Sequence, residues 1–206
     1  MMMAHYGYHL VDMYREQGLY EKAEQTYRMA LEAESKYEDP SKQAMKLWNA
    51  FAQVRVAQWR YEEAEGLFTE GIRIGKSELP GTGHPLTLRL INGLAVLRTK
   101  QKQYDEAEDL FGEALKGRKA KLGEDHPDTL KSKNDQGVLY IEMERYVDAE
   151  QPLLEAVEGR RLKLGDTHPR TLESWNNLIE LYDAWDKPDK ANKWRARLPV
   201  RGNVVK

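Results

Sequence analysis

Apolar residues recur along the chain at spacings of three and four residues, the period of an α-helix with one buried face. Near the middle, Leu88, Ile91 and Leu94 share such a face, and a second amphipathic run follows over residues 104–114. Only a short polar break, residues 100–103, separates the two runs. Two helices joined by so short a break run antiparallel, so this part of the chain predicts a helical hairpin.

One motif marks the second helix of every predicted hairpin. In the middle of the chain it reads Tyr104-Asp105-Glu106-Ala107-Glu108. Its alanine recurs every 41 to 43 residues. Such a period indicates stacked repeats, in which each unit buries its apolar face against its neighbours. The five alanines are Ala23, Ala64, Ala107, Ala149 and Ala191.

We therefore predict an all-α fold built as a single array over residues 1–198, with residues 199–206 as a frayed tail. The acidic residues of the motif, such as Glu63 and Glu65, stand at the same place in each hairpin. We expect them to serve helix starts and surface charge rather than acid–base catalysis. The predicted hairpin units span residues 4–40, 41–83, 84–125, 126–167 and 168–198.

A second recurring string joins each hairpin to the next. It reads Leu-Gly-x-x-His-Pro-x-Thr-Leu at residues 122–130 and 164–172, with variants at 80–88 and 38–41. Its glycine suits the left-handed conformation that ends a helix. Its proline suits the first turn of a helix, where no N–H is needed. The string therefore stops one helix and starts the next.

The histidines of this string, His84, His126 and His168, raise the question of a metal site. Equivalent positions in successive hairpins lie at least about 8–10 Å apart, because helices pack at that distance. Zinc holds its nitrogen ligands at about 2.0–2.1 Å. No two of these histidines therefore share an ion, and we expect a linker role, with no metal and no cofactor.

These strings resemble tetratricopeptide repeats of the 42-residue type found in kinesin light chains and many bacterial signalling proteins. The resemblance covers roughly residues 4–198. It implies a right-handed α-solenoid of five stacked helix-turn-helix hairpins. It also implies that the first helix of each hairpin lines a concave groove, which holds a peptide or a helix of a partner. The C-terminal end, residues 181–199, resembles the ends of repeat tails on some bacterial serine/threonine protein kinases.

Counting back from the motif alanines places two polar columns on the first helices. Asparagines stand fifteen residues before the alanine, and basic residues stand three residues earlier on the same helix face. The resemblance implies that both columns lie on the groove wall. Amides offer a donor and an acceptor to the backbone of an extended peptide, and the cations favour acidic side chains or a C-terminal carboxylate. The predicted groove residues are Lys46, Asn49, Arg89, Asn92, Lys131, Asn134 and Asn176.

A structural role for these columns stays open. In it, the asparagines bond neighbouring helices and the basic residues form surface ion pairs. Tyr8 in the first hairpin and Glu173 in the last depart from the columns. The basic strip is therefore expected only in the middle three hairpins.

Composition narrows the function classes. Charged residues make up 32% of the chain, hydrophobic residues 40%, and the net charge is −2. A slightly acidic chain does not favour nucleic acid or anionic lipid. There is no cysteine, and no apolar run approaches the length of about 20 residues that spans a bilayer.

We predict a cytoplasmic, non-enzymatic protein–protein interaction module that binds a peptide or partner segment in its groove. The alternative is a regulatory or substrate-docking tail of a larger bacterial signalling protein, such as a serine/threonine kinase. The abrupt start at Met1-Met2-Met3 suggests a fragment of that kind.

Overall fold

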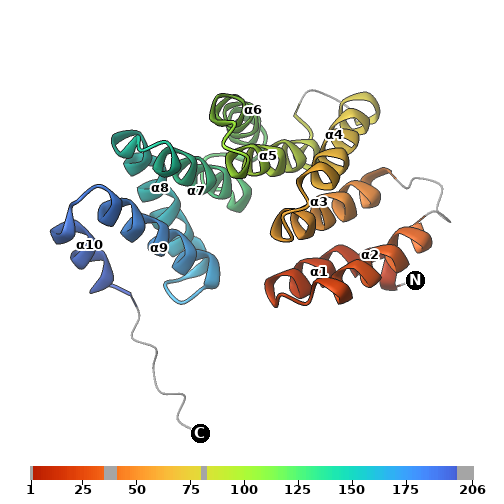
Figure 1. Ribbon diagram of the computed structural model, residues 1–206, viewed down its shortest axis with the longest axis horizontal. Coiled ribbons are helices and arrows are strands. Elements are labelled where there is room, and N and C mark those ends of the chain that lie inside the picture. The colour runs from red at the N-terminus through yellow and green to blue at the C-terminus, as the bar shows by residue number, and fades with distance from the viewer. Residues whose placement is uncertain (1, 35–40, 80–82, 199–206) are drawn as a thin grey trace, which may run out of the picture. The chain divides into compact units, whose positions relative to one another are not determined.

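The computed structural model describes residues 2–34, 41–79 and 83–198, without the side chains of residues 2–5, 34 and 41. The predicted frayed tail and the linker string at 38–41 fall almost entirely outside these ranges, as do residues 80–82 of the next linker. All regular elements in the described ranges are α-helices, which confirms the predicted fold class. Consecutive helices pair as hairpins, in which we call the first helix A and the second helix B (Figure 1).

The chain divides into two compact units, residues 1–121 and 122–206. Hairpins 1 to 3 lie in unit 1, and hairpins 4 and 5 lie in unit 2. The helices of unit 1 are α1 (Met2–Glu16), α2 (Tyr20–Glu34), α3 (Ser41–Ala57), α4 (Tyr61–Glu78), α5 (Pro85–Lys100) and α6 (Tyr104–Leu122). Those of unit 2 are α7 (Pro127–Glu142), α8 (Tyr146–Leu164), α9 (Pro169–Ala184) and α10 (Pro188–Arg195).

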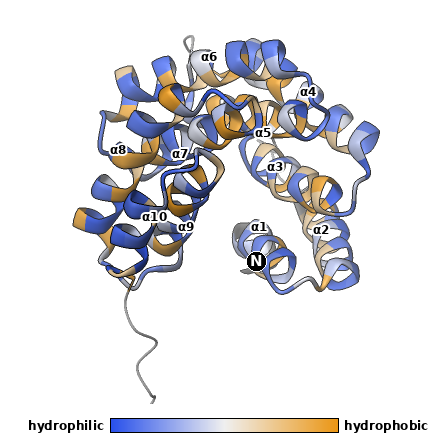
Figure 2. Ribbon diagram, turned by 60° about the vertical axis from the view of Figure 1, so that its left-hand side comes forward, coloured by the Kyte–Doolittle hydropathy of each residue, from blue (hydrophilic) through white to orange (hydrophobic). Residues whose placement is uncertain are grey.

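The core of each unit lies in the seams between helices. Figure 2 shows the alternation that builds it, with apolar and polar residues on opposite sides of the same helices. All five motif alanines are fully buried, so helices approach closely at these points. Gly71 on α4 shows how close the approach is, because a Cβ there would lie 2.8 Å from Leu90 Cδ1 of α5.

The corner of each hairpin has a conformation that the sequence did not reveal. The residue five positions before each motif alanine has a positive φ, between 51° and 70°. This left-handed region favours glycine, but only hairpin 1 has glycine there. The five corner residues are Gly18, Trp59, Lys102, Glu144 and Asp186.

The linkers after α6 and α8 act as predicted, since Gly123 and Gly165 directly follow these helices with φ values of 90° and 88°. In the linker after α4, the corresponding Gly81 lies outside the described residues, and Gly83, with a φ of 94°, directly precedes His84. In all three linkers the proline opens an A helix. The linker histidines prove to be N-caps. In each cap the imidazole Nδ1 accepts a hydrogen bond from the backbone N–H two residues on, at 3.2 Å for His84 and 3.1 Å for the other two.

Protonation would destroy these caps, because an imidazolium has no acceptor nitrogen. Burial and the charge of Lys42 lower the pKa of His84. A lowered pKa in the folded chain means that the unfolded chain binds more protons near its ordinary pKa of about 6.5. The stability from this cap is therefore present above about pH 6.5 and is lost as the pH falls below it.

We expect His84→Asn to remove part of the loss of thermal stability between pH 7.5 and pH 5.5, since asparagine caps a helix without titrating. The cap contributes about 1 kcal/mol. The comparison at pH 8, where both caps are intact, serves as the control. Equal acid sensitivity of the two proteins, measured by thermal melting, would contradict the assignment.

The motif glutamate links each hairpin to the next one. Glu65 on α4 accepts two hydrogen bonds from Arg98 on α5, at 2.7 and 2.8 Å. Glu24 on α2 accepts one from Arg55 on α3, at 3.0 Å. These hydrogen bonds lower the pKa of both carboxyl groups. The predicted role in helix starts and surface charge is therefore wrong for Glu65, because its carboxylate binds the following A helix.

The arginines of these links are almost fully buried. Each also lies close to a second carboxylate, which belongs to its own hairpin. Arg98 Nε lies 2.9 Å from Glu106, and Arg55 Nε lies 3.0 Å from Glu63. Both contacts are ion pairs. Each buried cation thus lies close to two carboxylates, which limits the cost of its burial.

Hairpins 4 and 5 are joined by the same kind of link, but different residues of hairpin 5 bind the carboxylate. Tyr182 stands where Arg55 and Arg98 stand, and its hydroxyl donates to Glu150 of hairpin 4 at 2.7 Å. Lys190 stands where Glu63 and Glu106 stand, and its Nζ lies 2.5 Å from the same carboxylate. Burial alone would raise the pKa of Glu150, but these two partners outweigh it and lower that pKa.

We expect Glu65→Gln to lower the free energy of unfolding by about 1–3 kcal/mol, because it removes a charged partner from buried Arg98. The matched control is Glu62→Gln on the same helix turn, an exposed position where a change of less than about 0.5 kcal/mol is expected. Urea unfolding measures both. Equal effects of the two substitutions would show that the link contributes nothing.

Candidate binding surface

The A helices of unit 1 pack side by side, with α3 in contact with both α1 and α5. Four polar or aromatic residues gather over these helices. Lys46 on α3 lies over the Tyr8 ring of α1, with Nζ 5.1 Å from the ring centroid. Asp12, one turn after Tyr8, interacts with the charge of Arg89 on α5. We call Tyr8, Asp12, Lys46 and Arg89 the A-helix face of unit 1.

The two predicted cations of unit 1 are half-buried on this face. The sequence expectation included Lys46 and Arg89 but not Asp12. A signal was available, because counting back eleven residues from the motif alanines reaches Asp12 in hairpin 1 and Glu180 in hairpin 5. Asp12 is thus an acid among the predicted groove cations.

Asp12 lies in an unfavourable environment for a carboxylate. Its Oδ1 is sealed from solvent and has no hydrogen-bond partner among the described residues. Arg15 Nε lies 3.7 Å from this oxygen, beyond hydrogen-bonding distance. Burial raises the pKa of Asp12 and outweighs the attraction of Arg15 and Arg89.

The asparagines of the predicted column lie in different environments. Asn134 on α7 is 2% exposed, and its Oδ1 accepts hydrogen bonds from Ser174 at 2.7 Å and Asn177 at 3.1 Å, both on α9. Asn92 on α5 is also 2% exposed and accepts from Arg118 at 3.2 Å. Asn176 on α9 is exposed. The amide oxygens of Asn92 and Asn134 therefore serve packing inside their units.

Asn49 on α3 differs from these residues. It is 6% exposed, and its Oδ1 is buried without a hydrogen-bond partner among the described residues. The repeat register explains the difference. The positions that carry Ser174 and Asn177 in hairpin 5 carry Leu90 and Gly93 in hairpin 3. Neither side chain offers a donor, so Asn49 has no equivalent partner on α5.

The polar seam of unit 2 includes a buried cation. Arg160 on α8 is 2% exposed and donates to Ser174 Oγ at 2.7 Å and to the backbone oxygen of Arg170 at 2.7 Å. Glu173 lies 3.2 Å from the same guanidinium. Burial lowers the pKa of Arg160, against the attraction of Glu173. Glu173, which replaces the basic residue of the column in hairpin 5, thus supplies a counter-charge for Arg160.

The last predicted cation, Lys131 on α7, is half-buried and pairs with Asp135 one turn later, at 2.6 Å. The ion pair joins two residues of one helix. This contact agrees with the structural alternative stated above, in which the basic residues form surface ion pairs.

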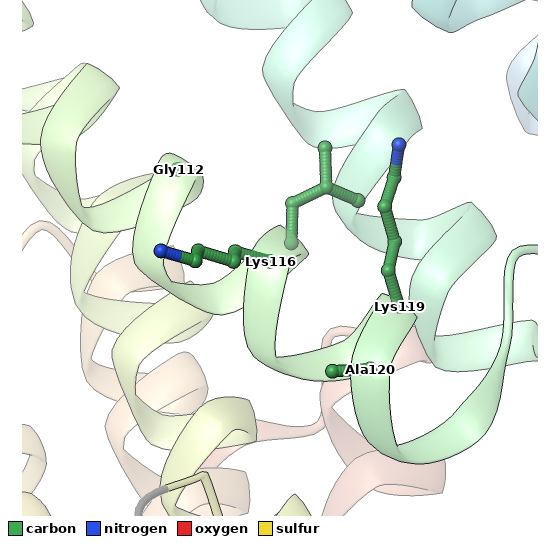
Figure 3. A pocket seen from close by; sticks show the side chains of 5 residues that line it. Gly112, Lys116, Lys119 and Ala120 are labelled. Atoms are coloured by element: carbon green, nitrogen blue, oxygen red, sulfur yellow. The ribbon is translucent and has the colours of Figure 1, made fainter.

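A hollow of about 520 Å³ lies along α6. Its lining residues, which include Gly112, Leu115 and Ala120, all belong to this one helix. Lys116 and Lys119 extend from it in different directions (Figure 3). The hollow is an open surface beside a single helix, and it brings together none of the predicted groove residues.

The described residues contain no group of three or more histidine, acidic or cysteine side chains placed to hold a metal ion. Over the same ranges, no helix combines the length and apolarity needed to cross a membrane.

Helical hairpins that recur with this register define a repeat protein. Comparison with family models identifies the repeat family. Two models described as tetratricopeptide repeats match the chain, one at residues 43–120 and 86–162 and the other at residues 8–41. The matches cover more than half of the chain, which therefore belongs to the tetratricopeptide repeat family. This fold supports a role as a protein–protein interaction module, and the family is typically a non-enzymatic scaffold.

Solved structures show the same fold. BtubC (BKLC) from P. vanneervenii is 21% identical, with a TM-score of 0.71, and the match covers 96% of this chain and 82% of that one. A putative kinesin light chain of Podosopora anserina with nearly identical TPR-like repeats is 19% identical, with a TM-score of 0.68 and coverages of 96% and 94%.

A Rap protein complexed with Competence and Sporulation Factor is 18% identical, with a TM-score of 0.80. The match covers 96% of this chain and 53% of that one. A search of curated protein sequences found no significant match.

The contrast between Asn49 and Asn134 predicts opposite responses to one substitution. Asn134→Leu leaves buried Ser174 and half-buried Asn177 of α9 without this acceptor and is expected to cost about 1–3 kcal/mol of unfolding free energy. Asn49→Leu removes an unpaired oxygen at nearly constant volume and is expected to be neutral or stabilising.

Chemical denaturation of both variants measures the difference. The two substitutions exchange the same atoms at the same repeat position, so each is the control for the other. Equal losses of stability would show that Asn49 has a packing role like that of Asn134.

Proposed function

We propose that this chain is a non-enzymatic interaction module that binds an extended peptide or partner segment over the A helices of unit 1. The observation that carries the proposal is the amide of Asn49, about one turn after half-buried Lys46 on α3, whose oxygen has no hydrogen-bond donor among the described residues. An unpaired buried amide costs stability. A backbone N–H of a bound peptide would satisfy it after the amide, whose oxygen is sealed from solvent in the free protein, turns toward the ligand.

The charges of this face favour the ligand chemistry expected from the sequence. Lys46 and Arg89 belong to neighbouring A helices, α3 and α5. Against them the same face carries Asp12. The cations outnumber the acid, so a segment with acidic side chains or a free C-terminal carboxylate is the partner that this face fits.

The proposed site is narrower than the seven residues predicted from the columns. Lys46, Asn49 and Arg89 remain as contact residues. Asn92, Lys131 and Asn134 have partners within their own units, so we assign them no ligand. Asn176 is exposed and belongs to unit 2, so it is not part of the proposed site. The complex of a Rap protein with Competence and Sporulation Factor supports the proposal only as an example of this fold with a bound partner.

To test it, the protein is probed with an array of 12-residue peptides of acidic, neutral and basic composition. We expect retention of acidic peptides, and we expect Arg89→Gln to weaken their binding by about tenfold, the loss of a charge-assisted contact of about 1.4 kcal/mol. Lys100→Gln is the matched control, because it removes one positive charge from the exposed end of the same helix.

Two results would contradict the proposal. In the first, the wild-type protein retains no peptide of any composition. In the second, Arg89→Gln and Lys100→Gln bind acidic peptides equally well. Circular dichroism of each variant confirms that the helices are intact.

A further inference from the structure

The A helices of hairpins 2, 3 and 5 bury an apolar face against the B helix of the preceding hairpin. Three positions carry this face, seventeen, thirteen and ten residues before the motif alanine. In hairpin 3 they are Leu90, Leu94 and Leu97, which form one buried cluster with Ala64 and Phe68 of α4. In hairpins 2 and 5 the apolar residues at these positions cluster in the same way with α2 and α8. The face is thus one half of the seam between consecutive hairpins.

Hairpin 1 exposes the corresponding face. The three positions are Tyr6, Leu10 and Met13 on α1. Tyr6 is 53% exposed and Met13 is 39% exposed, whereas Leu90 and Leu97 are fully buried. Within unit 1, α1 packs against α2 and α3 (Figure 1), and these exposures show that neither helix covers the face. The apolar half of a seam is therefore open at this end of unit 1.

A tyrosine–lysine pair belongs to the same hairpin. Tyr14 stands nine residues before the motif alanine, as Tyr182 does in hairpin 5. Lys22 stands one residue before it, as Lys190 does. In hairpin 5 this pair binds the carboxylate of Glu150 from the preceding B helix. In both hairpins the lysine Nζ lies over the tyrosine ring, 6.0 Å from the ring centroid in hairpin 1 and 5.1 Å in hairpin 5.

The pair in hairpin 1 holds no carboxylate. Over residues 2–34, 41–79 and 83–198, neither Tyr14 nor Lys22 has an acidic partner. Tyr14 is half-buried and Lys22 is exposed, so a carboxylate from outside can reach both. Hairpin 1 thus has the apolar face and the carboxylate-binding pair with which hairpin 5 binds a B helix.

We call this surface the α1 end face, and its residues are Tyr6, Leu10, Met13, Tyr14 and Lys22. We propose that the α1 end face binds the B helix of a hairpin of the same repeat type in a partner protein. The partner helix packs its small residues against the apolar side chains, as Gly71 of α4 packs against Leu90. The glutamate after its motif alanine binds Tyr14 and Lys22. This surface is separate from the proposed peptide site.

A second copy of this chain does not supply the required glutamate. The motif glutamates of α2, α4 and α8 are bound to the next hairpin. The last B helix, α10, has Asn192 at this position, and its amide oxygen accepts a hydrogen bond from Arg195. A neutral amide does not attract Lys22 as a carboxylate does. The helix that fits is therefore one that keeps the motif glutamate.

The test uses the full chain and a labelled peptide of the α8 sequence, residues 146–164, with blocked ends. This sequence serves as the probe because its Glu150 already binds a tyrosine–lysine pair. We expect the peptide to bind the wild type, as measured by fluorescence anisotropy. The Glu150→Gln peptide is expected to bind about tenfold more weakly, because it loses charge-assisted contacts.

Substitutions in the protein locate the site. Tyr14→Phe is expected to bind the wild-type peptide about tenfold more weakly and the Glu150→Gln peptide with unchanged affinity. This non-additivity identifies the two groups as partners, and a purely structural role of Tyr14 would not produce it. Met13→Gln is expected to weaken the wild-type peptide about fivefold through lost apolar contact.

Two variants are controls. Tyr20→Phe removes a hydroxyl from another half-buried tyrosine of hairpin 1, outside the α1 end face. Arg89→Gln changes the proposed peptide site. Both are expected to bind the α8 peptide as the wild type does, and circular dichroism confirms that the helices of every variant are intact.

Four results would overturn the proposal. The wild type does not bind the α8 peptide, or Tyr14→Phe and Tyr20→Phe bind it equally well. Self-association of the chain in sedimentation, abolished by Tyr14→Phe, would show that a second copy is the occupant. Failure of a longer natural form of the chain to bind the peptide would show that the occupant is a preceding hairpin of the same chain.

Discussion

The hairpins of each unit depend on one type of contact, a carboxylate of one B helix that binds the A helix of the next hairpin. Fully buried alanines bring the helices close together, and the close approach buries the arginines of the seam. A buried guanidinium without acids would be costly. Glu65 and Glu106 therefore both bind Arg98. Because these carboxylates belong to different hairpins, the same contact that satisfies the charge also fixes the register of the stack.

The seams differ in what they bury beside this link. Between hairpins 4 and 5, Arg160, Ser174 and Asn134 form a buried polar network whose members satisfy one another. Between hairpins 2 and 3, Gly71 and Leu90 meet instead, and the oxygen of Asn49 has no hydrogen-bond donor among the described residues. In the first seam the polar groups bond one another and stabilise the packing of the helices. The second leaves a polar group unpaired next to the cations of the A-helix face, which is the combination expected of a binding surface.

The sequence was sufficient for the fold because the repeat signal depends on local rules. Apolar spacing, a fixed alanine and a helix-stopping glycine act within a few residues, so they predicted the hairpins and their linkers. The partners of side chains across a seam depend on residues about 30 to 43 positions away. A column of identical residues therefore does not share one environment. Asn49, Asn134 and Asn176 stand at one repeat position, yet their neighbours make them unpaired, bonded and exposed, respectively. The columns predicted candidate residues. Whether a candidate has a packing role depends on its neighbours across the seam.

The same limit explains why the acid beside the predicted cations was missed. A count of cations along the columns sums like charges and contains no information on the acids that stacking brings beside them. Asp12 and Arg89 are separated by 77 positions in the sequence and come from hairpins that are not consecutive, yet their charges interact. A repeat array brings such residues together only by stacking. The charge on the A-helix face of unit 1 is therefore set by three hairpins, whereas the carboxylate links described above each join two consecutive hairpins.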